Sequence, residues 1–140
     1  MASEGARTIV VTVPMCPPRE CSPNYRQAWR GRHEATKAFR RAAYSAAMQK
    51  YGGFDCEPRF NGEPIPIFSG NVIVRAVIAW GKGRKSQDPA NAIGSLKPAL
   101  DGLEDAAIVA NDKQIQGVTI SQCRDPEGRG YVMLTVEAAP

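Results

Sequence analysis

A nearly continuous run of apolar residues from Asn71 to Trp80 constrains the fold more than any other segment. The run (NVIVRAVIAW) is rich in β-branched residues and is interrupted only by Arg75, so it predicts a β-strand. A run with so little polar alternation is typical of a strand that is covered on both faces. We therefore expect residues 71–80 to form the central strand of a sheet.

Three further strands and two main helices are expected around this strand. The other strands are residues 8–13, 118–123 and 131–138, and the turn residues Asp125–Gly130 predict that the last two strands form a hairpin. One helix is expected from Asn24 to Lys50, before Gly52 and Gly53. The other begins at Asp88, a good N-cap followed by Pro89, and runs to about Ala106 with a break near Gly94 and Pro98.

The segments between these elements contain many prolines and glycines, and residues 14–23 and 52–70 are expected to be loops. The aromatic and isoleucine side chains of the second loop indicate that it packs onto the protein. The order of elements, β-α-β-α-β-β, predicts an α/β (α+β) fold with a mixed β-sheet. A length of 140 residues fits one small domain spanning residues 1–140, and the sequence shows no internal repeat.

Composition and targeting signals exclude several classes of protein. Hydrophobic residues make up 43% and charged residues 23% of the chain, which is ordinary globular composition. The sequence has no apolar run of membrane-spanning length and no secretory signal, so we expect a cytoplasmic protein. Four cysteines without a CxxC pair and the single His33 argue against structural zinc and favour free thiols.

Basic residues recur along one side of the first expected helix. The basic stripe consists of Arg26, Arg30, Lys37 and Arg41, with Arg32 and Arg40 beside it. Such spacing places the four side chains on one helix face, where they suit the closely spaced phosphates of duplex DNA. A solvated surface face is the alternative explanation. A second basic cluster, Lys82, Arg84 and Lys85, lies directly before an acidic region and favours the DNA-binding interpretation.

The acidic region combines three carboxylates with a lysine. Asp88 lies at a strand-to-helix junction, Lys97 and Asp101 are four residues apart on one helix face, and Asp112 follows that helix. Converging carboxylates are ligands for Mg²⁺, which activates water and offsets phosphate charge. A nearby lysine would stabilise developing negative charge. Each residue also has an ordinary structural alternative: Asp88 as an N-cap, Lys97 and Asp101 as a helical ion pair, Asp112 as a turn residue.

The same region resembles the RusA-type Holliday-junction resolvases. The family's Asp-x-Asp-Asn motif resembles Asp88-Pro-Ala-Asn91, and its lysine and Leu-Asp-Ala-Leu motifs resemble Lys97-Pro-Ala-Leu-Asp-Gly-Leu103. The family's Gly-Val and Asp-Asp elements resemble Ala107-Ile108 and Asn111-Asp112-Lys-Gln-Ile115, while Ser22–Arg26 and Trp29-Arg30 are similar to its early loop and first helix. The resemblance follows the same order over most of the chain.

What the resemblance implies is a homodimer that binds four-way DNA junctions in recombination and repair and cuts them with Mg²⁺, or with Mn²⁺ in its place. It implies Asp88 and Asp112 as metal ligands, Lys97 as the catalytic lysine, and Asp101 as a further acid. Asn91 joins the basic residues as an expected DNA contact. The chain departs from the family at Ala90 and Asn111, where the family has aspartates, and in a longer gap between Asn91 and Lys97.

These departures leave two outcomes open: Asp101 replaces a missing ligand, or the protein binds branched DNA and cuts it slowly or not at all. A third hypothesis is a basic α/β protein that binds RNA, although the sequence lacks an aromatic RNP-like strand. For the homodimer, residues 52–70 or the first helix are the expected interface.

Overall fold

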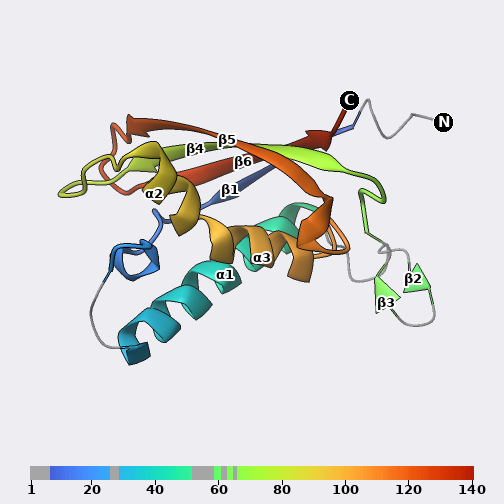
Figure 1. Cartoon of the computed structure of the whole chain (residues 1–140), viewed down its shortest axis with the longest axis horizontal. Coiled ribbons are helices and arrows are strands. Elements are labelled where there is room, and N and C mark those ends of the chain that lie inside the picture. The colour runs from blue at the N-terminus through green and yellow to red at the C-terminus, as the bar shows by residue number, and fades with distance from the viewer. Residues whose placement is uncertain (1–6, 26–28, 52–58, 61–62, 65) are drawn as a thin grey trace.

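A four-stranded mixed sheet lies over three helices in the computed structural model of the chain. The structure describes residues 7–25, 29–51, 59–60, 63–64 and 66–140, and only the backbone of residues 29–30, 59–60 and 63–64. The strands are β1 (Thr8–Val13), β4 (Val72–Trp80), β5 (Ile115–Arg124) and β6 (Tyr131–Ala138). The helices α1 (Trp29–Tyr51), α2 (Pro89–Ser95) and α3 (Lys97–Asp105) all lie on one side of the sheet (Figure 1). The predicted α+β fold class, with one small domain and a mixed sheet, is confirmed.

The apolar strand β4 is central, as predicted. The strand order is β1-β6-β4-β5, and β4 pairs with β5 in parallel and with β6 in antiparallel orientation. Burial along β4 alternates, however: Val72, Val74 and Ala76 are buried, whereas Arg75 is exposed. The expectation that both faces are covered is therefore wrong along most of β4, where Ile73, Arg75 and Val77 remain at least partly open to solvent, but it holds at the end of the strand, where Ile78, Ala79 and Trp80 are all buried.

The predicted hairpin of the last two strands is wrong, although the turn between them is present. β6 lies between β1 and β4, with Val132 opposite Val13 and Tyr131 opposite Ala79. The turn of residues 125–130 crosses the end of β4, where Asp125 N donates to Trp80 O at 2.9 Å. A turn sequence predicts only that the chain reverses; it does not specify which strand becomes the neighbour.

The carboxylate of Asp125 organises this turn. It accepts hydrogen bonds from the backbone N–H groups of Glu127 (3.0 Å), Arg129 (3.2 Å) and Gly130 (2.8 Å). The donors from Gly130 and Glu127 hold the pKa of Asp125 below its ordinary value. Gly130 has a φ of +90°, and a Cβ there would lie 2.3 Å from the Cys16 sulfur, so glycine is required at this position.

Helix α1 begins later than the sequence predicts. Asn24 lies in a turn, where its backbone N–H donates to Ser22 Oγ at 3.3 Å, and the first helical residue described is Trp29. Serine side chains that bond to the backbone two residues on favour such turns over a helix. Further along, α1 buries Phe39, Ala43 and Ala47 in the core. None of the described helices combines the length and apolar character needed to cross a membrane.

The second helical region is divided, as predicted, into α2 and α3 at Leu96. Pro98, near the start of α3, has no N–H to continue α2, which explains the break. α3 buries Ala99, Leu100 and Leu103 and packs on α1. The two helices lie close together at Gly102, where a Cβ would lie 2.5 Å from Arg40 O.

The expected loop of residues 52–70 is only partly described. Its described residues include two short paired strands, β2 (Arg59–Phe60) and β3 (Glu63–Pro64), so the loop prediction is wrong there. Phe68 is buried and forms a bridge with Val109, which confirms that this end of the segment packs onto the protein. Residues 52–58, 61–62 and 65 lie outside the described parts.

The cysteines form no disulfide within the described residues. Cys16, Cys21 and Cys123 are free thiols, as expected, and Cys56 lies outside the described residues. Cys16 Sγ donates to Ala79 O at 3.2 Å and accepts from Gly81 N at 3.3 Å, so it joins residues 14–18 to the end of β4. Burial raises the pKa of the Cys21 thiol, which lies 3.9 Å from the Thr36 hydroxyl.

Candidate functional site

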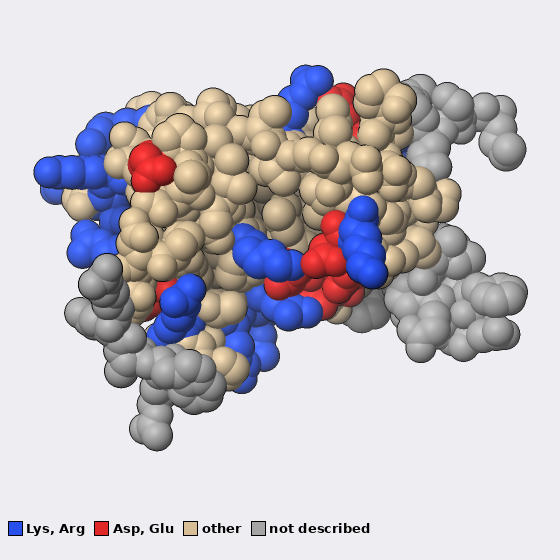
Figure 2. All heavy atoms as spheres, viewed as in Figure 1, with Lys and Arg blue, Asp and Glu red and all other residues tan. Residues whose placement is uncertain are grey.

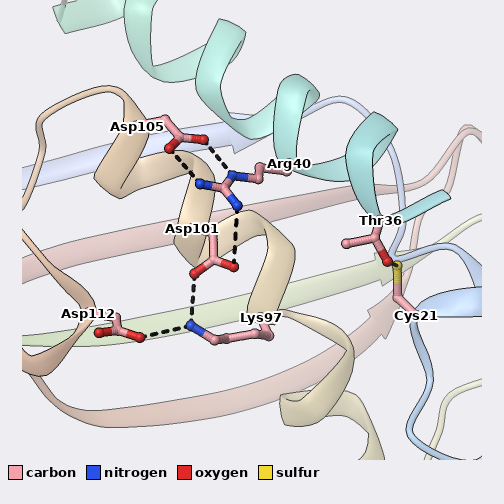
Figure 3. Close-up of polar contacts among 7 residues, drawn as sticks. All are labelled: Cys21, Thr36, Arg40, Lys97, Asp101, Asp105 and Asp112. Carbon is pink, nitrogen blue, oxygen red and sulfur yellow. Dashed lines mark hydrogen bonds and ion pairs between the residues drawn. The ribbon is translucent and has the colours of Figure 1, made fainter. Parts of the chain in front are cut away.

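Lys97, Asp101 and Asp112, three of the predicted site residues, meet at the first turn of α3. We call them the Lys97 cluster. Lys97 Nζ donates to Asp101 Oδ1 at 2.8 Å and to Asp112 Oδ2 at 2.9 Å (Figure 3). The two carboxylates, Asp101 first, raise the pKa of Lys97, and the hydrogen bond from Lys97 lowers the pKa of Asp112. These shifts favour the charged forms of the Lys97 ammonium and the Asp112 carboxylate.

Asp112 is held in place by a short 3₁₀ turn, η3 (Asp112–Gln114). Asn111 caps this turn, because its side chain accepts from Lys113 N at 2.9 Å. The buried Gln114 side chain accepts from Ala110 N and donates to the carbonyl groups of Phe68 and Gly70. Asn111, where the resemblance predicts an acid, thus supports the position of Asp112 without providing a carboxylate.

Asp88 does not join the Lys97 cluster. It caps α2, as its position before Pro89 predicts, by accepting hydrogen bonds from the backbone N–H groups of Ala90 (3.1 Å) and Asn91 (3.3 Å). Its other oxygen accepts from the Asn91 side-chain amide. Across the described residues, no group of three His, Cys, Asp or Glu side chains is arranged to hold a metal ion. The predicted acids therefore divide into a capping residue, Asp88, and a pair, Asp101 and Asp112.

Two further charged residues, which the sequence interpretation did not assign to the site, border the cluster. Arg40 of α1 donates to both oxygens of Asp105, at 2.6 and 2.7 Å, and lies 4.0 Å from Asp101 (Figure 3). In Figure 2, the largest group of acidic atoms on this face is bordered by basic atoms on several sides. The spacing of Lys97, Asp101 and Asp105, each four residues apart, is the signal that could have indicated this charged face of α3.

The basic stripe on α1 is exposed where it is described. Arg32, Lys37 and Arg41 are exposed, and Lys37 and Arg41 border a hollow of about 330 Å³ together with Glu34 and Ala38. Arg26 and the side chain of Arg30 lie outside the described residues. The exposed cations leave this face of α1 accessible to a polyanion.

The residues of the second basic cluster, in the loop after β4, differ in their exposure. Lys82 and Lys85 are exposed. Arg84 is half-buried: its guanidinium donates to Pro17 O at 2.8 Å and lies 4.9 Å from the centre of the Trp80 ring. Burial lowers the pKa of Arg84. Lys82 and Lys85 are therefore the accessible cations of this loop, and Arg84 is engaged within the protein.

Sequence comparisons add no relative to these observations: no protein-family model matches the chain, and no curated protein is significantly similar to it. The resemblance to RusA-type resolvases stays a prediction from the residues that carry it. What the site offers chemically is a convergent pair of carboxylates around one ammonium, close to an exposed basic helix.

Proposed function

We propose that this protein is a Mg²⁺-dependent endodeoxyribonuclease that binds four-way DNA junctions and hydrolyses phosphodiester bonds in them. The observation that carries the proposal is the Lys97 cluster, in which two carboxylates from separate elements converge on one cation. The exposed Lys37 and Arg41 of α1 supply positive charge for the DNA backbone, and α1 contacts α3 through Arg40. The resemblance to junction resolvases points to the same chemistry.

The carboxylate pair fits Mg²⁺ by its chemistry. Mg²⁺ in proteins is often held by one or two carboxylates, with waters and phosphate oxygens completing six ligands. Asp101 and Asp112 already direct one oxygen each at a single positive group, the Lys97 ammonium. Asp88 does not belong to this donor set: among the described residues it forms no group of three potential metal ligands with Asp101 and Asp112. When bound, Mg²⁺ would supply an activated water and offset charge on the phosphate.

Residues of the chain then have separate tasks. Lys97 is exposed, so its ammonium is accessible to a backbone phosphate, where it would donate to a non-bridging oxygen and stabilise negative charge in the transition state. Lys37 and Arg41, with Lys82 and Lys85 of the loop after β4, would hold the backbone without reading the bases. Asn91, whose side chain donates to Asp88, would be an uncharged DNA contact in the first turn of α2.

The symmetry of the substrate supports a homodimer. A four-way junction presents two equivalent strands, and a two-fold dimer would place one site at each. Residues 52–70 and α1 are the proposed contributors to its interface. Because junctions arise in chromosomal or phage DNA, we place the activity in the cytoplasm of a bacterial cell. Sedimentation at micromolar concentration tests the dimer: a single 15.2 kDa species would contradict it.

A second candidate function is branched-DNA binding without efficient cleavage. One observation favours it: Asp88 is separate from the carboxylate pair, and Ala90 and Asn111 supply no replacement acid. The second function would preserve the proposed DNA contacts and remove only the chemistry. The two candidates therefore predict the same junction affinity and different reaction products.

One assay separates these functions. A labelled four-way junction is incubated with the protein in Mg²⁺, with EDTA as the control, and binding is measured in parallel in Ca²⁺. Symmetric nicking that requires Mg²⁺ supports the nuclease; tight binding without nicking supports the second candidate. Duplex DNA and double-stranded RNA of equal length serve as competitors, and preference for RNA would contradict both proposals.

The basic stripe is tested with matched neutralising variants. Lys37→Gln and Arg41→Gln should each weaken junction binding and lower the slope of log affinity against log salt by about one. Arg75→Gln is the control, because Arg75 is an exposed arginine that pairs with Glu137 on the sheet, away from α1. Equal junction affinities of all three variants would show that α1 is not part of the DNA-binding surface.

A further inference from the structure

Arg40 connects the expected DNA-binding helix to the Lys97 cluster. Its guanidinium forms a two-point contact with Asp105, with Nε and Nη2 at 2.6 and 2.7 Å from the two carboxylate oxygens. The remaining nitrogen, Nη1, lies 4.0 Å from Asp101 Oδ2. The opposite oxygen of Asp101, Oδ1, accepts from Lys97. One carboxylate, that of Asp101, is therefore held between two cations from different helices (Figure 3).

The close approach of the two helices makes this contact possible. Gly102 follows Asp101 directly, and any Cβ at Gly102 would overlap Arg40 O and lie 2.8 Å from Ala43 Cβ. α3 therefore meets the backbone of α1 at the turn that carries Arg40. Asp101 and Asp105, one helical turn apart, lie on either side of this point of contact, so one arginine side chain reaches both carboxylates.

Arg40 lies beside two carboxylates of α3 that repel each other. Asp101 and Asp105 are like charges four residues apart, a spacing that destabilises a helix and drives the side chains apart. Arg40 offsets this repulsion, and its hydrogen bonds hold the pKa of Asp105 below its ordinary value. A guanidinium is a rigid fork with several donors, so it fixes carboxylate orientation better than a lysine ammonium does.

We propose that Arg40 is a positioning residue, which uses Asp105 as its anchor and fixes the Asp101 carboxylate in the orientation that, together with Asp112, receives a divalent cation. This inference rests on the proposed function for the identity of the cation. Arg40 itself contacts neither the cation nor the scissile phosphate. Its fork binds Asp105, and its remaining nitrogen acts on Asp101 as an ion pair at 4.0 Å, without a hydrogen bond.

Charge and geometry have opposite effects here, which determines the choice of variant. Removing the positive charge of Arg40 would by itself strengthen cation binding, because Arg40 and a divalent cation repel each other. Arg40→Lys keeps the charge and removes the fork, so any loss of cation affinity is a geometric effect. Arg75→Lys is the matched control, since Arg75 also contacts a carboxylate, Glu137 Oε1 at 2.6 Å, away from the cluster.

The experiment measures Mn²⁺ binding to the full chain without DNA, from the electron paramagnetic resonance signal of free Mn²⁺. Asp112→Asn identifies the fraction bound at the cluster. Outer partners of metal ligands typically change affinity at least tenfold when substituted, so Arg40→Lys should weaken the Asp112-dependent binding by about tenfold. Arg75→Lys should match the wild type. Asp105→Asn, which removes the anchor, should weaken binding in the same direction and substitutes for Arg40→Lys if that variant does not fold.

Each result decides the inference. Equal Mn²⁺ affinities of Arg40→Lys and Arg75→Lys would overturn it. A lower melting temperature of Arg40→Lys would not change that conclusion, because it would show only that Arg40 stabilises the packing of α1 on α3. Wild-type protein without Asp112-dependent Mn²⁺ binding would overturn it as well. If Arg40→Lys weakens Mn²⁺ binding but the wild type cuts no branched DNA, the positioning role stands and the proposed nuclease function fails.

Discussion

Lys97 Nζ lies 2.9 Å from Asp112 Oδ2, although fifteen residues separate them in the sequence. The contact joins the first residue of α3 to the first residue of η3, across the connection in which Ala107 has a φ of +60°. Because each group stabilises the charge of the other, a change at one alters the properties of both. The two positions therefore provide the most direct tests of the site.

The Asp112→Asn variant should lose Mg²⁺-dependent cleavage and keep its affinity for four-way junctions or bind them more tightly. Amide substitution removes a proposed metal ligand and also removes a negative charge that would face the DNA. Cleavage and binding are measured on the same labelled junction. Glu127→Gln removes the same charge from an exposed turn and should still cut; wild-type cleavage by Asp112→Asn would show that the metal-site assignment is incorrect.

Asp101→Asn, measured in the same assay, should lose as much activity as Asp112→Asn. The reason is that Asp101 and Asp112 both contact the Lys97 ammonium and form the proposed metal-binding pair, whereas Asp88 caps α2. A partial loss would instead mean that Asp101 only pairs with Lys97 and Arg40.

The Lys97→Met variant should cut DNA far more slowly than the wild type while its Mn²⁺ affinity is retained or rises. Lysine is not a metal ligand, and its removal leaves two carboxylates without their shared counter-ion. The hydrogen bond from Lys97 is the main cause of the lowered pKa of Asp112, so this pKa should rise toward its ordinary value. Carboxyl ¹³C chemical shifts followed against pH give the pKa; an unchanged value would mean that the contact does not form in solution.

Arg84→Ala should destabilise the protein by about 1–2 kcal/mol, because the variant loses a cation–π contact with Trp80 and a hydrogen bond to Pro17 O. Thermal unfolding measures this loss. Lys85→Ala, one position along, should keep the melting temperature and weaken junction binding instead. A reversed result, with Arg84→Ala stable and weak in DNA binding, would mean that Arg84 turns outward when DNA binds.

Gly102→Ala should destabilise the protein by about 1–3 kcal/mol, since the added methyl group overlaps Arg40 O in the contact between α1 and α3. Gly31→Ala is the control within α1: a Cβ there has no neighbour within 4 Å, and the change should be neutral or stabilising by up to about 1 kcal/mol. Urea unfolding of both variants compares them. Equal stabilities would show that the helices lie further apart than described.

The Asp125→Asn variant should lower the melting temperature at neutral pH by several degrees, and the difference should shrink in acid. The folded-state pKa of Asp125 is lowered by backbone N–H donors, so folding favours the ionised carboxylate. Its stabilisation is fully present above the unfolded pKa of about 3.9 and is lost as pH falls through the lower folded value. Melting curves from pH 7 to the acid limit of folding measure this; a difference that grows in acid would contradict the assignment.

Local patterns in the sequence were sufficient for the main elements. The apolar run of β4, the cap and proline at Asp88 and Pro89, and the break near Pro98 depend on residues close together in the chain, and all three were predicted. The four-residue spacing of Lys97 and Asp101 likewise predicted their contact. Short-range geometry controls these features, so a single sequence is enough to recognise them.

Long-range contacts explain what was not predicted. The turn from Asp125 to Gly130 indicates that the chain reverses. Its hydrogen bonds with Lys82 and Trp80, however, hold the turn across the end of β4, so that β6 pairs with β4 and β1 and not with β5. The inward position of Arg84 depends on Trp80 and Pro17, and the role of Arg40 depends on a second helix. None of these partners is visible from spacing within one segment. Separation of Asp88 from the carboxylate pair has the same origin, since it depends on how α2 and α3 are placed relative to each other.

The position of β6 has a consequence for how the chain reaches its native state. β1 and β4 do not pair with each other; residues 131–138 lie between them and supply both hydrogen-bonded ladders. During synthesis, the sheet therefore cannot close until those residues have left the ribosome, and until then β1 and one edge of β4 present unpaired backbone groups. Pairing of segments more than a hundred residues apart, such as Val13 with Val132, also predicts slow folding. The nascent chain thus depends on its last strand to protect its first.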